Sequence, residues 1–298
     1  MPWRRTVPQN AGMTKPPLIQ AADLLQLLQG TAARPVVFDC SFDLANPAAG
    51  RVLHDAGHLP GALYLHLDDD LSAPKTGRNG RHPLPTREAF AERLAVLGVN
   101  DGCPVVVYDA SGGMYAARAW WMLRWAGHVD VAVLDGGLAA WKAAGGPVVA
   151  TPTAPPARGS FTLRPPRVAT VDRVTLLDNL DKPQFLVIDA RAPDRFRGEN
   201  ETLDARAGHI PGACNRLFRD NLGPDGRFKP AEQLRSEFLA VAGRRPPTEW
   251  VNSCGSGVTA AHNLLAQEVA GLHGAALYPG SWSEWSSWPD APVATGLE

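Results

Sequence analysis

Short β-branched and aliphatic runs alternate along the chain with longer segments whose apolar residues recur at helical spacing. In the first half this pattern predicts helices over 18–29, 87–97 and 115–126, and strands over 35–39, 104–108 and 131–134. In the second half it predicts helices over 171–180, 230–241 and 258–270, and strands over 185–189 and 248–252. Strands that alternate with helices form mainly parallel sheets covered by helices on both faces. The sequence therefore predicts an α/β fold.

The two halves of the chain also resemble each other. Residues 56–62 read Ala-Gly-His-Leu-Pro-Gly-Ala, and residues 207–213 read Ala-Gly-His-Ile-Pro-Gly-Ala. Three further anchors recur in the same order, and one of them aligns Ser111 with Cys254 at an offset of 143 positions. Repeat arrays have periods of roughly 20–50 residues, so this much longer period indicates a duplicated domain.

Length and linker composition agree with two domains. A chain of 298 residues exceeds the size at which one hydrophobic core usually stops growing. Between the halves, residues 149–160 are too rich in proline and glycine to sustain a helix or a strand. We therefore predict a first domain over 13–148, a linker over 149–160 and a second domain over 161–298.

Charge and cysteine usage restrict the partners and the compartment. The formal net charge is −1 with both signs scattered, so neither a nucleic acid nor a membrane surface is expected as a partner. The first 22 residues hold no apolar stretch long enough for a signal peptide. The four cysteines form no C-x-x-C pair, which favours a reducing cytoplasm over a disulfide framework or a zinc site; they are Cys40, Cys103, Cys214 and Cys254.

Cys254 differs from the other cysteines in its neighbours. It follows a predicted strand and precedes Gly255-Ser256-Gly257 and a helix that begins near Val258. A glycine-rich loop at a helix start can turn several N–H groups toward one anion, such as a thiolate or the terminal sulfur of a persulfide. We expect Cys254 to be a nucleophile, and the alignment with Ser111 implies that only the second domain carries it.

Other interpretations of the same loop are weaker. Residues 255–260 match a G-x-G-x-x-A dinucleotide pattern, but the next predicted strand, 275–278, is followed by Pro-Gly and no acidic residue for a ribose. A cysteine phosphatase would need an arginine six residues after the cysteine, where Ala260 stands. A purely structural cysteine remains an alternative, although glycine-rich loops are a poor choice for rigidity alone.

Taken together, these motifs resemble the rhodanese superfamily of tandem-domain sulfurtransferases over nearly the whole chain. The matching segments are Asp39-Cys40, His58-Leu59-Pro60-Gly61, Tyr108-Asp109-Ala110, Trp120-Trp121, Gly136-Gly137, Asp189-Ala190-Arg191 and the Cys254 loop. The resemblance implies two rhodanese-like domains, each a mainly parallel sheet flanked by helices. It also implies an active carboxyl-terminal domain, a silent amino-terminal domain and no cofactor. The clustered tryptophans are then interpreted as core and interdomain packing.

Within that superfamily, Cys-Gly-Ser-Gly-Val-Thr looks like the loop of the 3-mercaptopyruvate type, whereas thiosulfate-preferring members usually carry cations directly after the cysteine. Thiosulfate is a compact dianion that gains from such cations, while neutral N–H and hydroxyl donors can satisfy a keto acid. The resemblance makes Gly255, Ser256, Gly257, Val258 and Thr259 the donor-binding loop. Thiosulfate as donor, and a persulfide carrier without turnover, are the alternatives.

The resemblance also names a substrate cation. Arg195 aligns with the substrate-binding arginine of the family. A second family arginine lies in a Pro-Glu-Pro-Arg segment, but here the stretch 199–206 departs from that pattern and is shorter. Arg206 is a candidate replacement, with a solvated surface charge as the other interpretation, and Arg197 is a nearer rival of Arg195.

The same comparison points to a proton relay and an acceptor. His58 and Ser256 are the candidates for a relay with an acidic residue, for which Asp55 is nearest in sequence. The alternative for His58 is a turn residue, because His209 occupies the matching turn of the second half. Cys254 would accept sulfur from the donor and pass it to a thiol such as thioredoxin, or to cyanide in an assay.

Overall fold

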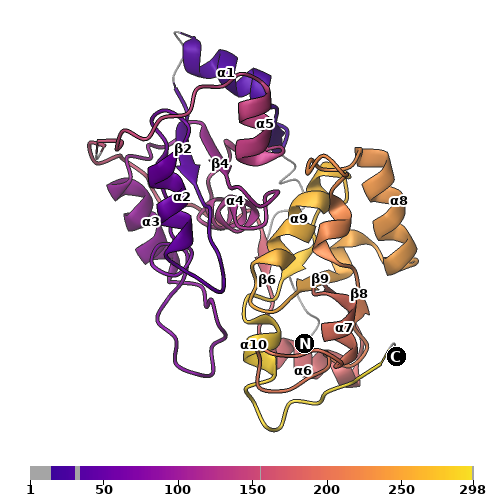
Figure 1. Cartoon of the computed structure of the whole chain (residues 1–298). Helices are drawn as coiled ribbons and strands as arrows, with labels where there is room; N and C mark the ends of the chain where they lie inside the picture. Colours follow the sequence, from indigo (N-terminus) through magenta and orange to yellow (C-terminus); the bar gives the residue numbers. More distant parts are fainter. Residues whose placement is uncertain (1–14, 31–33, 155, 297–298) are drawn as a thin grey trace.

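The computed structural model describes residues 15–30, 34–154 and 156–296, and within them the strands form two parallel sheets of five strands each. Helices flank both sheets, and the two halves lie side by side (Figure 1). The predicted α/β class with two tandem parallel-sheet domains is confirmed. Two predictions concern residues that the structure does not describe. The segment tested for a signal peptide lies mostly in residues 1–14, and the predicted outer domain boundaries are residues 13 and 298.

The first half contains five helices and one sheet in the order β1-β5-β4-β2-β3 within the described residues. Its elements are β1 (Leu18–Ile19), α1 (Ala21–Gln29), β2 (Val36–Asp39), α2 (Ala49–Ala56), β3 (Leu63–Tyr64), α3 (Arg87–Val96), β4 (Val105–Tyr108), α4 (Ala116–Trp125), β5 (Val131–Leu134) and α5 (Gly137–Ala143).

The second half repeats this order as β6-β10-β9-β7-β8 and adds two short 3-10 helices. Its elements are β6 (Ala169–Thr170), α6 (Arg173–Asp181), β7 (Leu186–Asp189), α7 (Pro193–Arg197), β8 (Cys214–Asn215), η1 (Phe218–Asn221), α8 (Ala231–Ala242), η2 (Pro247–Glu249), β9 (Trp250–Ser253), α9 (Thr259–Val269), β10 (Ala276–Leu277) and α10 (Ser281–Trp285). Each strand and each α-helix of the first half therefore has a counterpart in the second half.

The two domains meet along helices α4 and α9 (Figure 1). These are the helices that follow the central strands β4 and β9, so each begins directly after a loop at the carboxyl end of its sheet. One cluster of buried apolar side chains runs from Trp120 and Trp121 on α4 to Ala261 and Leu265 on α9. Because this core is continuous, loops from both domains are held together at the carboxyl ends of the strands.

The first helix and the linker can be compared with their predicted bounds. The helix predicted from residue 18 begins only at Ala21, because Leu18 and Ile19 pair with β5 as an edge strand. The predicted linker contains no helix or strand in its described residues beyond an isolated bridge between Val149 and His58. It then follows the first domain, where the Gly159 N–H donates to the Ala95 carbonyl.

Membrane-spanning segments were also considered. Across the described stretches of the chain, every helix falls short of the length and apolar character needed to cross a bilayer.

Candidate functional site

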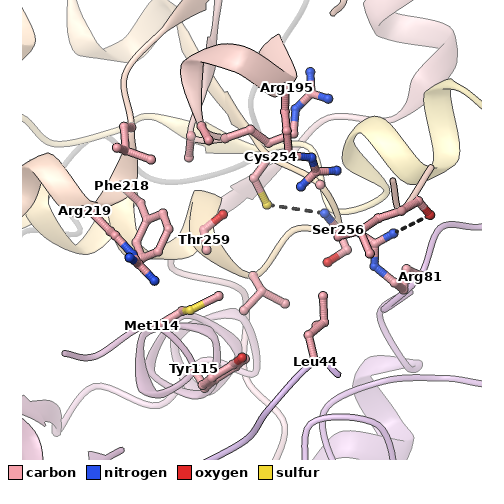
Figure 2. Close-up of a pocket in the computed structure, with 17 residues that line it drawn as sticks. Leu44, Arg81, Met114, Tyr115, Arg195, Phe218, Arg219, Cys254, Ser256 and Thr259 are labelled. Atoms are coloured by element: carbon pink, nitrogen blue, oxygen red, sulfur yellow. Dashed lines mark hydrogen bonds between the residues drawn. The ribbon is translucent and has the colours of Figure 1, made fainter. Parts of the chain in front are cut away.

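Cys254 lies directly after β9, in the loop that leads into α9. Its side chain is 1% exposed, and its Sγ accepts hydrogen bonds from the N–H groups of Gly257 at 3.1 Å and Ser256 at 3.4 Å (Figure 2). Gly257 has a φ of +75°, and a Cβ there would stand 2.4 Å from the Pro279 carbonyl oxygen. Only glycine fits this position, so the loop is shaped around the sulfur atom.

A cavity of about 320 Å³ opens at this sulfur atom, at the lower end of the range for small-molecule sites. Both domains contribute to its wall, the first through a few loop residues and the second through the cysteine loop, the segment after β7, helix α7 and η1. The wall is formed by Leu44, Arg81, Met114, Tyr115, Ala190, Arg191, Ala192, Arg195, Leu203, Leu217, Phe218, Arg219, Cys254, Gly255, Ser256, Val258 and Thr259. Four residues of the predicted donor-binding loop line the cavity, namely Gly255, Ser256, Val258 and Thr259. The fifth, Gly257, does not line it and donates its N–H to the Cys254 sulfur.

The counterpart of Cys254 in the first domain is Asp109, not Ser111. In the sheets, Asp39 pairs with Tyr108 as Asp189 pairs with Ser253, so the residues that follow these two strand ends correspond. The loop between β4 and α4 is two residues longer than the loop between β9 and α9. The sequence alignment followed the residues on the helix side of this insertion and therefore missed the true position by two.

Asp109 shows how such a loop holds an anion. One carboxylate oxygen accepts N–H bonds from Ser111 and Gly113 at 2.7 and 2.9 Å, and the other accepts from Tyr115 and Ala116 at 2.8 and 2.9 Å. Burial raises the pKa of the Asp109 carboxyl, whereas the four N–H donors act to lower it. The carboxylate oxygens are as many bonds from the backbone as the outer sulfur of a cysteine persulfide, so the silent domain displays an anion where the second domain would carry that sulfur.

Ser281 supports the cysteine from the other side of the loop. Among the residues that the structure describes, Ser281 is the one non-glycine residue with a positive φ, which is +52°. Its counterpart in the first domain is a glycine, Gly137. The Oγ of Ser281 accepts the Cys254 N–H at 3.1 Å and lies 3.9 Å from the sulfur atom. Strained backbone of this kind is maintained where the side chain has a task, here the fixing of Cys254.

A histidine from the first domain reaches the loop, but it is His82 and not His58. The Nδ1 of His82 lies 2.7 Å from the Ser256 hydroxyl, and its Nε2 lies 3.5 Å from a carboxylate oxygen of Asp68. With the Nε2 proton turned toward Asp68, Nδ1 is free to accept the hydroxyl proton of Ser256. His82 and Ser256 are hydrogen-bonded, whereas the Asp68 oxygen lies near Nε2 without forming a hydrogen bond, so in this structure only the His82–Ser256 link has the geometry of a proton relay.

His58 occupies the turn position that was its alternative interpretation. Its Nδ1 bonds the His54 carbonyl at 2.7 Å, and its ring does not line the cavity. His209 does the same in the second domain, where Nδ1 bonds the Phe196 carbonyl at 2.8 Å. Asp55, the expected acid partner, is exposed. The structure therefore does not bring His58 and Ser256 together.

The surroundings keep His82 neutral. Burial lowers the pKa of this imidazole to about 3, and the positive charges of Arg118, Arg81 and Lys75 act in the same direction. The ring therefore stays neutral over the whole physiological pH range, and its Nδ1 can accept the hydrogen bond of the Ser256 hydroxyl. A pKa this low makes His82 a weak base, so its main role in this chain is to orient the Ser256 hydroxyl.

Arg118, on α4, connects His82 to the cysteine loop from behind. It is fully buried, and its guanidinium donates to the carbonyl oxygens of Gly257 at 3.1 Å, His82 at 3.1 Å and Leu71 at 3.3 Å. Burial lowers the pKa of Arg118 to about 10, while the nearby Cys254 acts to raise it. The first domain thus supplies a buried positive charge that also fixes the loop geometry.

Arg195, the predicted substrate cation, lines the cavity from α7 (Figure 2). It is already paired, with its Nη2 2.8 Å from both Glu201 carboxylate oxygens and 3.0 Å from Asp204. A Cβ at Gly255 would stand 2.9 Å from Nη2 of Arg81 and 3.7 Å from Nη1 of Arg195, so glycine is what allows these guanidiniums to approach the loop.

This side of the cavity forms a balanced ionic network. Arg81 binds Asp204 at 2.6 Å, and Arg191 binds Asp189 at 2.7 Å and lies 3.5 Å from Glu201. The three arginines Arg81, Arg191 and Arg195 thus face the three carboxylates of Asp189, Glu201 and Asp204. The formal charge of this side is zero, although arginine N–H groups still point at the cysteine loop.

The two alternative cations lie elsewhere. Arg206 donates to the carbonyl oxygens of Ser286 at 3.1 Å and Trp288 at 2.7 Å, and so holds the end of α10. Arg197 pairs with Glu199 at 2.7 Å at the surface. Neither lines the cavity, so among the arginines considered from sequence, only Arg195 does.

Several of the site residues carry no signal in the sequence. Asp68, Arg81 and His82 come from a long loop between β3 and α3, and Arg118 comes from a helix that also packs the domain core. His82 and Ser256 are 174 positions apart, so local spacing carries no information about their contact. The one feature of the sequence that could have drawn attention to these residues is that the loop before α3 combines charged residues and a histidine without a helical or strand pattern.

Metal sites were searched in the same part of the chain. Among residues 15–30, 34–154 and 156–296, no group of three or more His, Cys, Asp or Glu side chains is arranged to hold a metal ion.

Comparison with known proteins agrees with this geometry. The sequence matches the rhodanese-like domain family over residues 20–144 and 172–287. A relative from Pseudomonas aeruginosa, named probable 3-mercaptopyruvate sulfurtransferase, is 49% identical over 264 residues, covering 88% of this chain and 92% of the relative. Thiosulfate sulfurtransferase of Bos taurus is 36% identical over 259 residues, covering 84% of each. The structure of 3-mercaptopyruvate sulfurtransferase from Leishmania major has a TM-score of 0.79 and 27% identity, covering 96% of this chain and 77% of that one. The chain therefore belongs to the rhodanese family and carries two rhodanese-like domains in tandem.

Proposed function

We propose that this chain is a 3-mercaptopyruvate sulfurtransferase that carries the transferred sulfur as a persulfide on Cys254. The observation that carries the proposal is the Cys254 sulfur at the foot of the cavity, bonded by two loop N–H groups. The names of the Pseudomonas aeruginosa and Leishmania major relatives support the same donor.

The donor half-reaction can be written with the residues at the site. The Cys254 thiolate attacks the sulfur of mercaptopyruvate, the sulfur–carbon bond breaks, and pyruvate leaves as its enolate. The proton of the donor thiol then passes to the enolate carbon, which yields pyruvate and the persulfide anion. Ser256 and His82 offer a path for this proton, and the loop N–H groups stabilise the anion that remains on the enzyme.

The charge on the side of the cavity beside Gly255 and Ser256 supports mercaptopyruvate over thiosulfate. Gly255 and Ser256 are neutral, and the arginines beside them are matched by the carboxylates of Glu201 and Asp204. A dianion gains little from a balanced network, whereas the single carboxylate and keto oxygen of mercaptopyruvate need only the N–H groups of Arg195 and the Ser256 hydroxyl. Thiosulfate is the second candidate, because the bovine relative is named for it.

Turnover of both donors with cyanide as acceptor separates the two candidates. We expect kcat/KM for mercaptopyruvate to exceed that for thiosulfate by at least about tenfold, which corresponds to about 1.4 kcal/mol. A higher value for thiosulfate would overturn the choice of donor. Intact mass after incubation with mercaptopyruvate alone should show a gain of one sulfur that is absent in Cys254→Ser. No gain in the unchanged chain would favour the carrier that takes persulfide only from a partner.

The acceptor is a thiol, and we include thioredoxin among the candidates, acting in the cytoplasm. All four cysteines of the chain are unpaired thiols, which suits a reducing compartment. Discharge of the persulfide by reduced thioredoxin, followed by loss of one sulfur from the protein mass, tests this acceptor directly.

A further inference from the structure

The two sides of the cavity differ in charge. On one side of Cys254, Figure 2 shows Arg195 and Arg81, whose charges are matched by carboxylates. On the other side it shows Phe218 and Arg219, both on η1. We propose that this second side is an acceptor subsite that binds a low-molecular-weight thiol bearing a carboxylate. The inference rests on the proposed function, because it assigns the molecule that takes the sulfur from Cys254.

Arg219 brings a positive charge that its neighbours do not neutralise. It is exposed and lines the cavity, and within the described residues the structure gives its side chain no carboxylate partner. The adjacent Asp220 lies 3.3 Å from Arg216, which also binds Glu237 at 2.6 Å. The acid nearest in sequence is therefore engaged elsewhere, and Arg219 can receive an incoming anion without breaking an ion pair.

An apolar wall separates this charge from the reacting sulfur. Phe218, from η1, and Met114, from the loop before α4 of the first domain, line the cavity beside Arg219 (Figure 2). Phe218 is held in place, because its N–H donates to the Ala190 carbonyl and its ring stands edge-on to His262 at 5.5 Å. A sulfur atom, an apolar wall and then a cation match a thiol, a short hydrocarbon spacer and then a carboxylate.

The donor belongs to the opposite side. Its keto oxygen must lie near Ser256 when the enolate forms, and Ser256 lies with Arg195 and Arg81 in Figure 2. Pyruvate leaves before the acceptor enters. The donor reacts with the Cys254 sulfur and the acceptor with the outer sulfur of the persulfide, and only the donor requires the balanced arginine network. The Arg219 side remains for the body of the acceptor.

The acceptor step balances with the same proton path. The acceptor thiol gives up its proton, its sulfur attacks the outer sulfur of the persulfide, and the bond between the two persulfide sulfurs breaks. Cys254 returns as a thiolate, and the proton ends on the transferred sulfur of the new hydropersulfide. Ser256 and His82 again lie where this proton moves.

The test measures discharge of the persulfide-loaded enzyme by two thiols of similar size. The enzyme is loaded with mercaptopyruvate and freed of donor, and loss of the bound sulfur is followed by intact mass with 3-mercaptopropionate and with 2-mercaptoethanol. We expect the ratio of the two discharge rate constants, anionic over neutral thiol, to fall about fivefold in Arg219→Ala and further in Arg219→Glu, with the difference reduced at high salt. Arg197→Ala, which removes an arginine outside the cavity, is the control and should keep the ratio of the unchanged chain.

Each other outcome overturns the inference in a distinguishable way. An unchanged ratio in both Arg219 variants would show that the acceptor carboxylate does not bind there. If this ratio fell in Arg195→Lys and not in the Arg219 variants, the acceptor carboxylate would bind on the donor side of the cavity. Failure of mercaptopyruvate to load Cys254 would count against the proposed function itself; loading with thiosulfate would then allow the same ratios to be measured, and if no donor loads Cys254 the inference falls with the function.

Discussion

The loop after β4 and the loop after β9 are built on the same plan but hold different anions. In the first domain the Asp109 carboxylate fills the loop and accepts four N–H bonds. In the second domain the Cys254 sulfur accepts two and faces an open cavity. The loop of the first domain is thus closed by its own side chain, whereas the loop of the second domain faces open space, where the proposed function places the transferred sulfur.

The comparison also shows that the silent domain is not idle. Its long loop before α3 provides Asp68, Arg81 and His82, and its helix α4 provides Arg118. The first domain therefore completes the site that the second domain begins. Duplication supplied two anion-binding loops, and their association across α4 and α9 allowed one of them to be served by side chains of the other domain.

The largest expected effect comes from making the active loop like the silent one. Cys254→Asp places a carboxylate among the same N–H donors, so we expect a folded protein whose turnover falls by on the order of 10⁴-fold or more, because the nucleophile is gone. Turnover with cyanide as acceptor measures the loss of activity, and thermal unfolding shows whether the variant is folded. Cys103→Ser, which changes a thiol outside the cavity, is the control. Persistent turnover in Cys254→Asp would contradict the assignment of the nucleophile.

A smaller effect is expected when the relay from the silent domain is interrupted. His82→Asn should lower kcat/KM by about 10²-fold, because Ser256 loses the acceptor that orients its hydroxyl. Since burial lowers the pKa of His82 to about 3, the unchanged enzyme should show no titration of this ring between about pH 5 and 8. The pH profile of kcat/KM checks this, with His58→Asn as the control. A limb near pH 6.5 that disappears only in His82→Asn would contradict the neutral base.

The same shift has a consequence for stability. The unfolded chain binds a proton at His82 below about pH 6.5, while the folded ring, with its pKa near 3, does not. Stability is therefore lost as the pH falls from about 6.5 toward 3. His82→Asn should make this loss shallower in urea unfolding.

A further decrease is expected from the buried arginine. Arg118→Lys cannot reach the Gly257 and His82 carbonyls together, so kcat/KM should fall by about tenfold. The rate at which iodoacetamide alkylates Cys254, measured against pH, reports the environment of the thiolate separately from folding. Arg124→Lys is the matched control, since Arg124 is buried on the same helix but has no bond to the loop. Equal changes in both variants would indicate a merely structural role for Arg118.

The smallest effect is expected at the strained serine. Ser281→Gly introduces the residue that the silent domain has at Gly137. Relief of the positive φ, worth about 1 kcal/mol, offsets part of the loss of the two hydrogen bonds of the hydroxyl, to Cys254 and Tyr278, worth about 1 kcal/mol each, so the free energy of unfolding should fall by about 1 kcal/mol. We expect turnover to fall about threefold, because the cysteine is held less firmly. A loss of more than tenfold would mean that the hydroxyl takes part in the chemistry.

The residues predicted from the sequence were those whose role is local. Cys254 with its glycine-rich loop follows directly from a strand-to-helix transition. Arg195 was predicted from the resemblance to the family, through the motif Asp189-Ala190-Arg191 that precedes it. The counterpart of Cys254 was misplaced at Ser111, because a two-residue insertion is invisible without the sheet register. The relay was assigned to His58, because a motif histidine is easier to notice than His82 in an irregular loop.

By itself, the sequence determined the α/β class and the duplication and singled out Cys254 as the candidate nucleophile, because hydrophobic period, repeated motifs and a glycine-rich loop all act over short stretches of chain. Only the tertiary structure decided which side chains surround that cysteine. His82, Arg81 and Arg118 reach the cysteine loop because α4 and α9 pack into one continuous core, and this contact joins residues more than 100 positions apart. No local pattern records such a contact, since its free energy comes from apolar burial between domains and not from the residues that it aligns.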